Sequence, residues 1–176
     1  MPLIDKRYAE ALVEIAYTAN AIEEIRQQLK EVTDIYESQQ ELRLLLNNPK
    51  VKIDAKKAIV NSIFSKHVRP EILKFLLLLI DNERIKHLSG INDEFIRLAD
   101  IKQNTLNMTI ISAAELDESY ITRIKEKYQK IYNAARVRAN LEIDKSIMGG
   151  IMLKIGDKVI DGSVKGRFES LKEMLN

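Results

Sequence analysis

Few residues of this chain have the type and spacing that enzymatic chemistry requires. The only two histidines, His67 and His87, lie 20 residues apart with no carboxylate at metal-ligand spacing. Asp157 and Asp161 could form a carboxylate pair, but aspartate is also a usual residue of hairpin turns and Asx turns. We therefore expect no catalytic residues and no metal site, and we predict that the chain is not an enzyme.

A short glycine-rich segment, GSVKG at residues 162–166, has the composition of a phosphate-binding loop. Helix N-termini do bind anions, but the segment lacks the spacing of a P-loop or of a GxGxxG dinucleotide motif. A turn followed by a helix that Ser163 caps explains the same residues. The sequence therefore predicts no nucleotide and no other cofactor.

The elements around this segment can be predicted from residue spacing. Ile151, Leu153 and Ile155 alternate with less apolar residues, which indicates a strand. Gly156-Asp157 fits a two-residue hairpin turn, because glycine tolerates a positive φ. A return strand begins at Val159 and closes at Asp161-Gly162-Ser163. A helix should follow Ser163, since apolar residues then recur at helical spacing at Val164, Phe168, Leu171 and Leu175.

Two glycines precede this strand. Gly149 and Gly150 either permit a close approach of two backbone segments or mark a β-bulge. Their predicted role is to maintain the fold.

The first part of the chain predicts helices. Six stretches with apolar residues at helical spacing lie at about 4–19, 22–36, 41–46, 54–64, 71–82 and 85–103. Asp54 is expected to cap the fourth helix, and Pro70 suits the first turn of the fifth. Residues 75–80 are apolar all round, so this helix is either the central helix of a bundle or leaves one flank open for a partner helix.

The spacing changes after residue 104. Residues 106–111 predict a strand, Asp117 can cap a helix that continues to Ile131, and residues 137–143 alternate as a second strand. The predicted fold class is therefore α+β. An N-terminal six-helix bundle, residues 1–104, precedes a small C-terminal α/β domain with a short sheet, residues 105–176.

Composition and charge exclude several classes. The longest apolar run, residues 75–80, is far shorter than the ~20 residues of a membrane-spanning helix, so no direct membrane insertion is expected. Residues 1–104 carry 16 basic and 16 acidic side chains, whereas nucleic-acid binders concentrate basic charge. There is no cysteine and no apolar signal peptide at the start, which indicates use in the compartment of synthesis.

Three segments carry a family resemblance. Residues 149–171, GGIMLKIGDKVIDGSVKGRFESL, resemble the C-terminal signature of delta subunits of F-type ATP synthases, the family of the mitochondrial oligomycin-sensitivity-conferring protein. RYAEALVEIA at residues 7–16 resembles the opening helix of that family, and ISAAEL at residues 111–116 resembles its interdomain strand end. Phe168 stands where the family more often has leucine.

The resemblance implies a non-catalytic stator subunit. It would link the catalytic alpha/beta head of the synthase to the peripheral-stalk b subunits, so that rotor torque is coupled to ion transport and ATP synthesis. One copy per complex is expected, peripheral to the cytoplasmic face of the cell inner membrane. A helical adaptor or regulator that binds RNA or a signalling partner is the alternative.

The resemblance also implies two binding surfaces. In the family, the first and fifth helices form a groove for the N-terminal helix of an alpha subunit, and the C-terminal domain engages the C-terminal ends of the b subunits. The candidate residues for alpha binding are Tyr8, Ala11, Leu12, Ile15, Leu76 and Leu79. Those of the C-terminal signature, for b binding, are Gly149, Gly150, Gly156, Asp157, Asp161, Gly162, Ser163 and Arg167.

Overall fold

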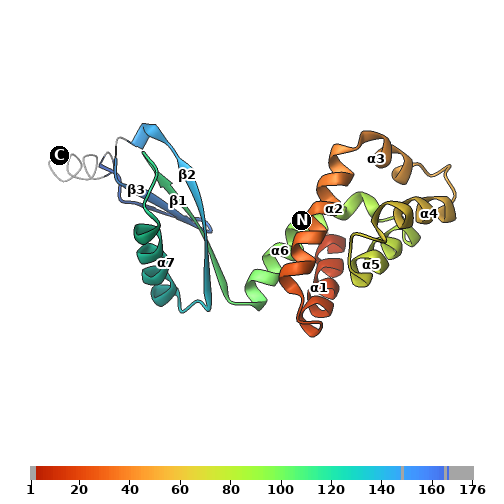
Figure 1. Cartoon of the computed structure of the whole chain (residues 1–176), viewed down its shortest axis with the longest axis horizontal. Coiled ribbons are helices and arrows are strands. Elements are labelled where there is room, and N and C mark those ends of the chain that lie inside the picture. Colours follow the sequence, from red (N-terminus) through yellow and green to blue (C-terminus); the bar gives the residue numbers. More distant parts are fainter. Residues whose placement is uncertain (1–2, 148, 165, 167–176) are drawn as a thin grey trace. The chain divides into compact units, whose positions relative to one another are not determined.

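The computed structural model describes residues 3–147, 149–164 and 166 (Figure 1). The chain divides into two compact units, residues 1–99 and residues 100–176. Each unit has a hydrophobic core of its own.

The first unit consists of helices (Figure 1). Along the chain these are α1 (Leu3–Thr18), α2 (Ile22–Ser38), α3 (Gln40–Asn47), α4 (Ile53–Phe64), α5 (Pro70–Asp81), the 3₁₀ helix η1 (Ile85–His87) and α6 (Leu88–Lys102), which runs into the second unit. The predicted helical bundle is thus confirmed. Within the described residues, the bundle has one helical segment more than expected. The sixth helix is predicted to begin at Ile85, but Ile85–His87 form the separate 3₁₀ helix η1, and α6 begins at Leu88.

Two predicted helix starts had different outcomes. Pro70 occupies the first turn of α5, as expected, because its missing N–H has no helical partner at that position. Asp54 does not cap α4: the helix begins at Ile53, with Lys52 at the N-cap position. Asp54 lies instead in the first turn, where its negative charge faces the positive end of the helix dipole.

Helix α5 lies against the core of the first unit with most of its surface. Phe75, Leu76, Leu79 and Ile80 are buried, whereas Leu78 is 48% exposed. The core also contains the fully buried side chains of Leu12, Ile25, Leu29, Ile72, Ile91 and Phe95. The all-round apolar character of residues 75–80 therefore reflects a central helix that keeps one apolar residue at the surface.

A buried carboxylate is paired within α6. Glu94 is only 2% exposed, and the Arg97 guanidinium donates hydrogen bonds of 2.8 and 2.6 Å to its two oxygens. These bonds hold the pKa of the Glu94 carboxyl below its ordinary value of 4.5, against the opposing effect of burial. Folding is therefore stabilised by ionised Glu94 above about pH 4.5, and this contribution is lost as the pH falls through the lower pKa of the folded state.

The pairing predicts a pH-dependent effect of Glu94→Gln. We expect this variant to lose stability in urea unfolding at pH 7, and the difference from the wild type to shrink as the pH falls below about 4.5. Glu10→Gln is the control, since Glu10 forms an exposed pair with Lys6 at 3.8 Å and such pairs contribute little. A difference that stayed constant down to pH 3 would contradict a stabilising ionised Glu94.

The second unit contains a four-stranded sheet with one helix. Its elements are β1 (Thr105–Ser112), α7 (Glu118–Tyr132), β2 (Arg136–Ile143), η2 (Lys145–Ile147), β3 (Ile151–Ile155) and β4 (Lys158–Asp161). The strand order is β2-β1-β3-β4; β1 and β2 are parallel, and the other two pairings are antiparallel. This arrangement confirms the predicted α+β class.

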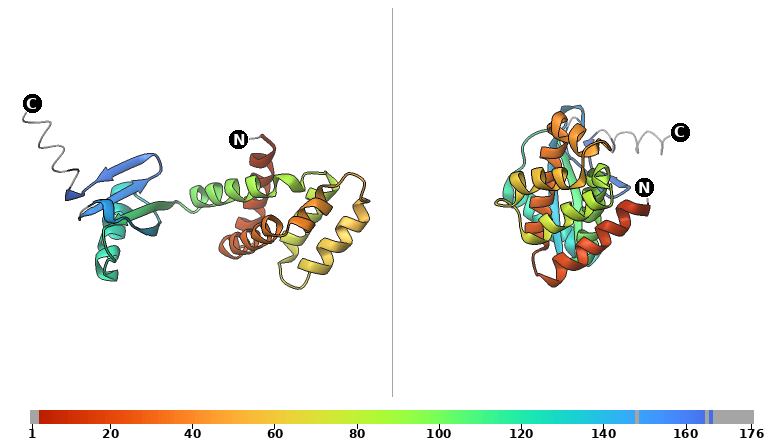
Figure 2. Two further views of the ribbon diagram at one scale, coloured as in Figure 1. Left: turned by 90° about the horizontal axis from the view of Figure 1, so that it is seen from above. Right: turned by 90° about the vertical axis from the view of Figure 1, so that its right-hand side faces the viewer.

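Helix α7 covers one face of the sheet (Figure 2). Its Ile121, Ile124 and Tyr128 form a core with Met108, Ile110, Leu153 and Ile155 of the strands. On edge strand β2, Val137 and Ala139 pack against this core, but Leu141 and Ile143 are 51% and 55% exposed. The alternation on β2 therefore predicted the strand correctly. Leu141 and Ile143, on the second half of its apolar side, are left uncovered by the described residues.

Candidate functional site

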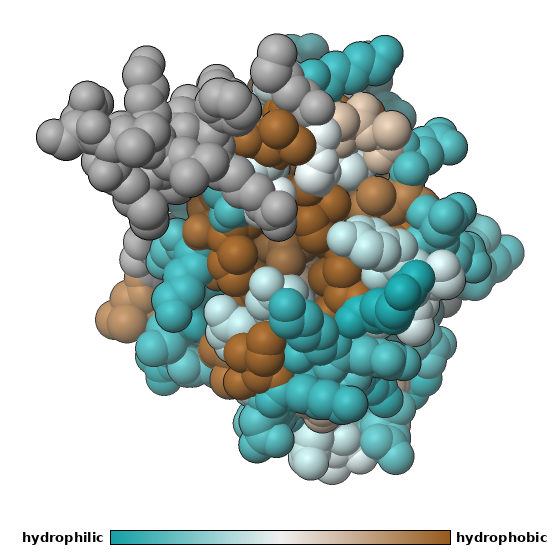
Figure 3. Space-filling model, turned by 90° about the vertical axis from the view of Figure 1, so that its left-hand side faces the viewer, coloured by the Kyte–Doolittle hydropathy of each residue, from teal (hydrophilic) through white to brown (hydrophobic). Residues whose placement is uncertain are grey.

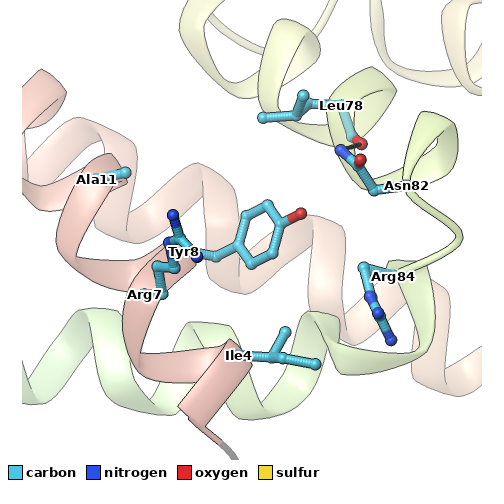
Figure 4. Close-up of a pocket in the computed structure, with 7 residues that line it drawn as sticks. All are labelled: Ile4, Arg7, Tyr8, Ala11, Leu78, Asn82 and Arg84. Atoms are coloured by element: carbon cyan, nitrogen blue, oxygen red, sulfur yellow. Dashed lines mark hydrogen bonds between the residues drawn. The ribbon is translucent and has the colours of Figure 1, made fainter.

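A groove of about 420 Å³ lies between α1 and the end of α5 (Figure 4). Seven residues line it: Ile4, Arg7, Tyr8 and Ala11 from α1, Leu78 from α5, and Asn82 and Arg84 from the segment that follows α5. Ile4, Tyr8 and Ala11 recur at helical spacing, so α1 presents them on one side. The groove is therefore an apolar strip with polar residues along its walls.

The shape of the groove follows from side-chain size. Ala11 is exposed and has no atom beyond Cβ, so a partner can approach α1 closely there. The Tyr8 ring packs edge-on against Phe75 of α5, with ring centroids 6.3 Å apart at 73°. This contact holds the Tyr8 ring in place, and Figure 4 shows the ring between Ile4 and Leu78. The result is a surface suited to an apolar helix face.

A buried pair joins the start of α1 to η1. The Asp5 Oδ1 atom lies 2.8 Å from His87 Nδ1, and Asp5 is only 5% exposed. Gly90 permits this position, because a Cβ there would overlap Asp5 Oδ2. Sequence reasoning missed the pair, although Asp5 falls on the buried stripe of α1 with Ala9, Leu12, Val13 and Ala16. A charged residue on an apolar stripe was the available signal.

The residues predicted for alpha binding do not all reach the groove. Tyr8 and Ala11 line it. Leu12, Leu76 and Leu79 are buried in the core instead, and the side of α5 that faces the groove carries Leu78. Ile15 is exposed but lies beside Glu14, Thr18 and Ala19, outside the groove. The structure therefore brings together two of the six predicted residues and adds Ile4, Arg7, Leu78, Asn82 and Arg84.

The C-terminal signature forms one backbone arrangement in the second unit. The Val164 N–H donates to Gly149 O at 3.1 Å, and the Gly162 N–H donates to Ile151 O at 2.9 Å. Gly150 has a φ of +80°, and a Cβ there would lie 2.6 Å from Gly162 O. Of the two roles predicted for this glycine pair, the close approach of two backbone segments is the one observed at Gly150.

The Asp-Gly-Ser segment ends the hairpin and begins a helix. Asp161 Oδ1 accepts a hydrogen bond of 2.7 Å from the Ser163 N–H, and Ser163 Oγ accepts one of 3.0 Å from the Gly166 N–H. Ser163 therefore acts as the predicted N-cap. Gly156, with a φ of +56°, and Asp157 form the predicted two-residue turn between β3 and β4. Arg167 and the predicted helix positions Phe168, Leu171 and Leu175 lie outside the described residues.

An apolar strip crosses the sheet face that α7 partly covers. The pairing of the strands places Leu141, Ile110, Leu153 and Ile160 in one row. The inner two are buried, whereas the outer two, Leu141 and Ile160, are exposed, as are Ile143 and Val164. Figure 3 shows apolar side chains gathered in the middle of one face with hydrophilic side chains around them. Exposed apolar strips of this kind mark contact surfaces.

The described part of the chain contains no group of three or more His, Cys, Asp or Glu side chains that could hold a metal ion. His67 is exposed in the turn after α4, while His87 is committed to Asp5. Among the same residues, none of the helices combines the length and apolar character needed to cross a membrane.

Comparisons with known proteins agree with the arrangement of these elements. The family model described as ATP synthase delta (OSCP) subunit matches residues 4–175. The chain is 43% identical to the ATP synthase subunit delta of Acetivibrio thermocellus, over 99% of this chain and 98% of that protein. It is 42% identical to the ATP synthase subunit delta of Ruminiclostridium cellulolyticum, over 100% of this chain and 99% of that protein.

Solved structures support the same fold. A chain of the Toxoplasma gondii mitochondrial ATP synthase hexamer superposes with a TM-score of 0.68 at 21% identity, covering 99% of this chain and 98% of that chain. A chain of the Polytomella F-ATP synthase gives a TM-score of 0.52 at 18% identity, covering 56% of this chain and 87% of that chain. Since the family model spans nearly the whole sequence and the relatives match end to end, this chain belongs to the delta (OSCP) subunit family of F-type ATP synthases.

Proposed function

We propose that this chain is a non-catalytic stator subunit of an F-type ATP synthase. It links the catalytic alpha/beta head to the b subunits of the peripheral stalk, so that torque from the rotor drives synthesis and does not turn the head. The observation that carries this proposal is the presence of two apolar surfaces, one in each unit: the α1–α5 groove and the exposed strip of the sheet. A link between two bodies requires two such surfaces.

The groove takes the N-terminal helix of an alpha subunit in a helix-in-groove mode. Tyr8 and Ala11 contact this helix together with Ile4 and Leu78, while Leu12, Leu76 and Leu79 support the walls from the core. Ile15 extends the apolar surface along α1 beyond the groove. Affinity comes from burial of apolar area, at roughly 25 cal/mol per Å² before the costs of association.

The second unit takes the C-terminal ends of the b subunits. Leu141 and Ile143 on β2 and Ile160 on β4 supply exposed apolar area. Gly149, Gly150, Gly162 and Ser163 act indirectly, since their hydrogen bonds and close packing hold the hairpin in place. In this proposal residues 1–104 and 105–176 are separate domains, each of which binds one partner.

The groove assignment predicts the effect of one substitution on alpha binding. Ala11→Asp places a charge on an exposed residue in the groove, so the protein should fold while an apolar helix face loses its contact. We expect calorimetric titration with the N-terminal peptide of the alpha subunit to show at least tenfold weaker binding, about 1.4 kcal/mol. The matched control is Ala58→Asp, at an exposed site on α4 outside the groove lining. Equal affinity of the two variants would refute the groove assignment.

The proposed location is the cytoplasmic face of the cell inner membrane, as a peripheral part of the synthase. Support comes from the membership of this chain in the delta subunit family and from its bacterial relatives. One copy per complex is expected, since a single link suffices to hold the head. Native mass spectrometry of the purified synthase measures this number directly, and a complex that lacks the chain would contradict the proposal.

A further inference from the structure

The α1–α5 groove carries two arginines on opposite walls. Figure 4 shows Arg7 on the α1 wall and Arg84 on the wall that follows α5, with Tyr8 and Ile4 between them. An apolar helix needs no cation to bind an apolar strip. The two guanidinium groups therefore call for an explanation beyond the burial of apolar area.

Several other basic side chains of the first unit have carboxylate partners. Arg69 pairs with Glu24 and Glu71, Arg97 with Glu94, Lys57 with Asp81, and Lys6 with Glu10. In the part of the chain that the structure describes, neither guanidinium of the groove has a carboxylate within ion-pair distance. The carboxylate of Asp5, the acidic residue closest to Arg7 in sequence, is held by His87.

A partner that covers the groove removes water from both guanidinium groups. Loss of hydration without a new hydrogen-bond partner weakens binding, whereas a carboxylate accepts two parallel N–H bonds from an arginine. Arginine also stays charged at any physiological pH, so the requirement does not vanish with protonation. The favourable occupant is thus an apolar helix face with acidic side chains beside it.

We propose that Arg7 and Arg84 select an amphipathic helix whose apolar stripe is flanked by aspartate or glutamate. This inference rests on the proposed function, because it takes the groove as the alpha-subunit site, and it adds a determinant of specificity. Contact area comes from the uncharged side chains of Tyr8, Ala11 and Leu78, which do not distinguish an acidic partner from a basic one. Arg7 and Arg84 then fix which apolar helices bind and in which register, since the carboxylates must fall opposite the two walls.

A double-mutant cycle tests the proposal. The probe is the N-terminal peptide of the alpha subunit from the same synthase, with a second peptide in which the acidic residues beside the apolar stripe become amides. The full chain is titrated as wild type, Arg7→Gln, Arg84→Gln and the double variant, at low and at high salt. Lys30→Gln, an exposed residue of α2 outside the groove, is the matched control for the loss of one charge.

We expect each single variant to bind the acidic peptide ~3–10-fold more weakly at low salt, and the double variant more than ~10-fold. The amide peptide should bind the wild-type protein more weakly than the acidic peptide does, by a similar factor. Replacement of both arginines should then lower the affinity for the amide peptide little further. High salt should reduce all of these differences in affinity, because it screens the interactions between charges. Lys30→Gln should bind as the wild type does.

Several results would overturn the proposal. If the arginine variants bind as the wild type does while Ala11→Asp does not, the groove assignment stands and the acidic selection fails. An alpha peptide with no acidic residue beside its stripe would also refute the selection. Retention of the wild type, but not the double variant, on anionic lipid vesicles would assign the arginines to a lipid surface. If the wild type does not bind the peptide at all, both proposals fail.

Discussion

Replacement of Gly150 by valine is expected to destabilise the second unit by more than about 3 kcal/mol. The φ of +80° at this position disfavours any side chain, and a β-branched one most of all. A Cβ would also lie 2.6 Å from Gly162 O and 2.9 Å from Ser163 Cα. Both atoms belong to backbone, so neither can rotate away, and the hairpin must move as a whole.

Gly156→Ala is the control for this prediction. Gly156 also has a positive φ, +56°, but an added Cβ meets nothing within 4 Å. Its replacement by alanine should therefore lower the stability only by the cost of a left-handed backbone conformation, about 1–2 kcal/mol. The larger loss expected for Gly150→Val contains the close approach together with the added cost of a β-branched side chain at positive φ.

Amide hydrogen exchange of the full chain reports on this unit directly. Protection of the paired amides of β1 and β3 should fall strongly in Gly150→Val and modestly in Gly156→Ala, while the helices of the first unit keep theirs. Equal losses in the two variants would show that the contact between Gly150 and the Gly162-Ser163 backbone contributes nothing to stability.

Replacement of Gly90 by alanine is the second prediction with a large effect. In a helix, alanine is normally more stable than glycine by about 0.5–1 kcal/mol. Here the new Cβ would overlap Asp5 Oδ2 and lie 3.0 Å from Asp5 Cγ. Because Asp5 is buried and bonded to His87, it cannot turn away without breaking that bond. We therefore expect a loss of about 1–3 kcal/mol.

The sign of this effect should reverse when Asp5 is removed. In an Asp5→Ala background, the atom nearest to the new Cβ is the Cβ of residue 5, at 3.8 Å, an ordinary contact. Gly90→Ala should then stabilise the protein by its usual helix propensity, about 0.5–1 kcal/mol. Urea unfolding followed by the helical circular dichroism signal gives all four free energies of the cycle. Additive effects would mean that Gly90 is not required for the Asp5–His87 pair.

This second prediction also bears on binding. Asp5 precedes Arg7 and Tyr8 on α1, and His87 follows Arg84, so the buried pair joins the segments that form the two walls of the groove. A variant that breaks the pair while the unit stays folded should loosen both walls. We expect an alpha peptide to bind Gly90→Ala more weakly than the wild type, because the groove is less preorganised although every contact residue is still present.

The sequence alone determined the kinds of elements and their order. Helical spacing, the change to a period of two after residue 104, Pro70 and the Gly156-Asp157 turn are local features, and local backbone preferences suffice to interpret them. Part of the motif of residues 149–171 was also readable, because the turn at Gly156 and the Ser163 cap act on neighbouring backbone. Fold class and family could therefore be predicted correctly.

The tertiary structure decided which side chains remain at the surface. Residues 75–80 of α5 are apolar all round, so spacing cannot tell Leu78, which is exposed, from Leu76 and Leu79, which are buried. Only the positions of α1 and the other helices make that choice. The Asp5–His87 pair joins residues 82 positions apart. The groove walls that carry Arg7 and Arg84 likewise come from distant parts of the chain. Contacts between distant segments depend on packing, and no local pattern encodes them.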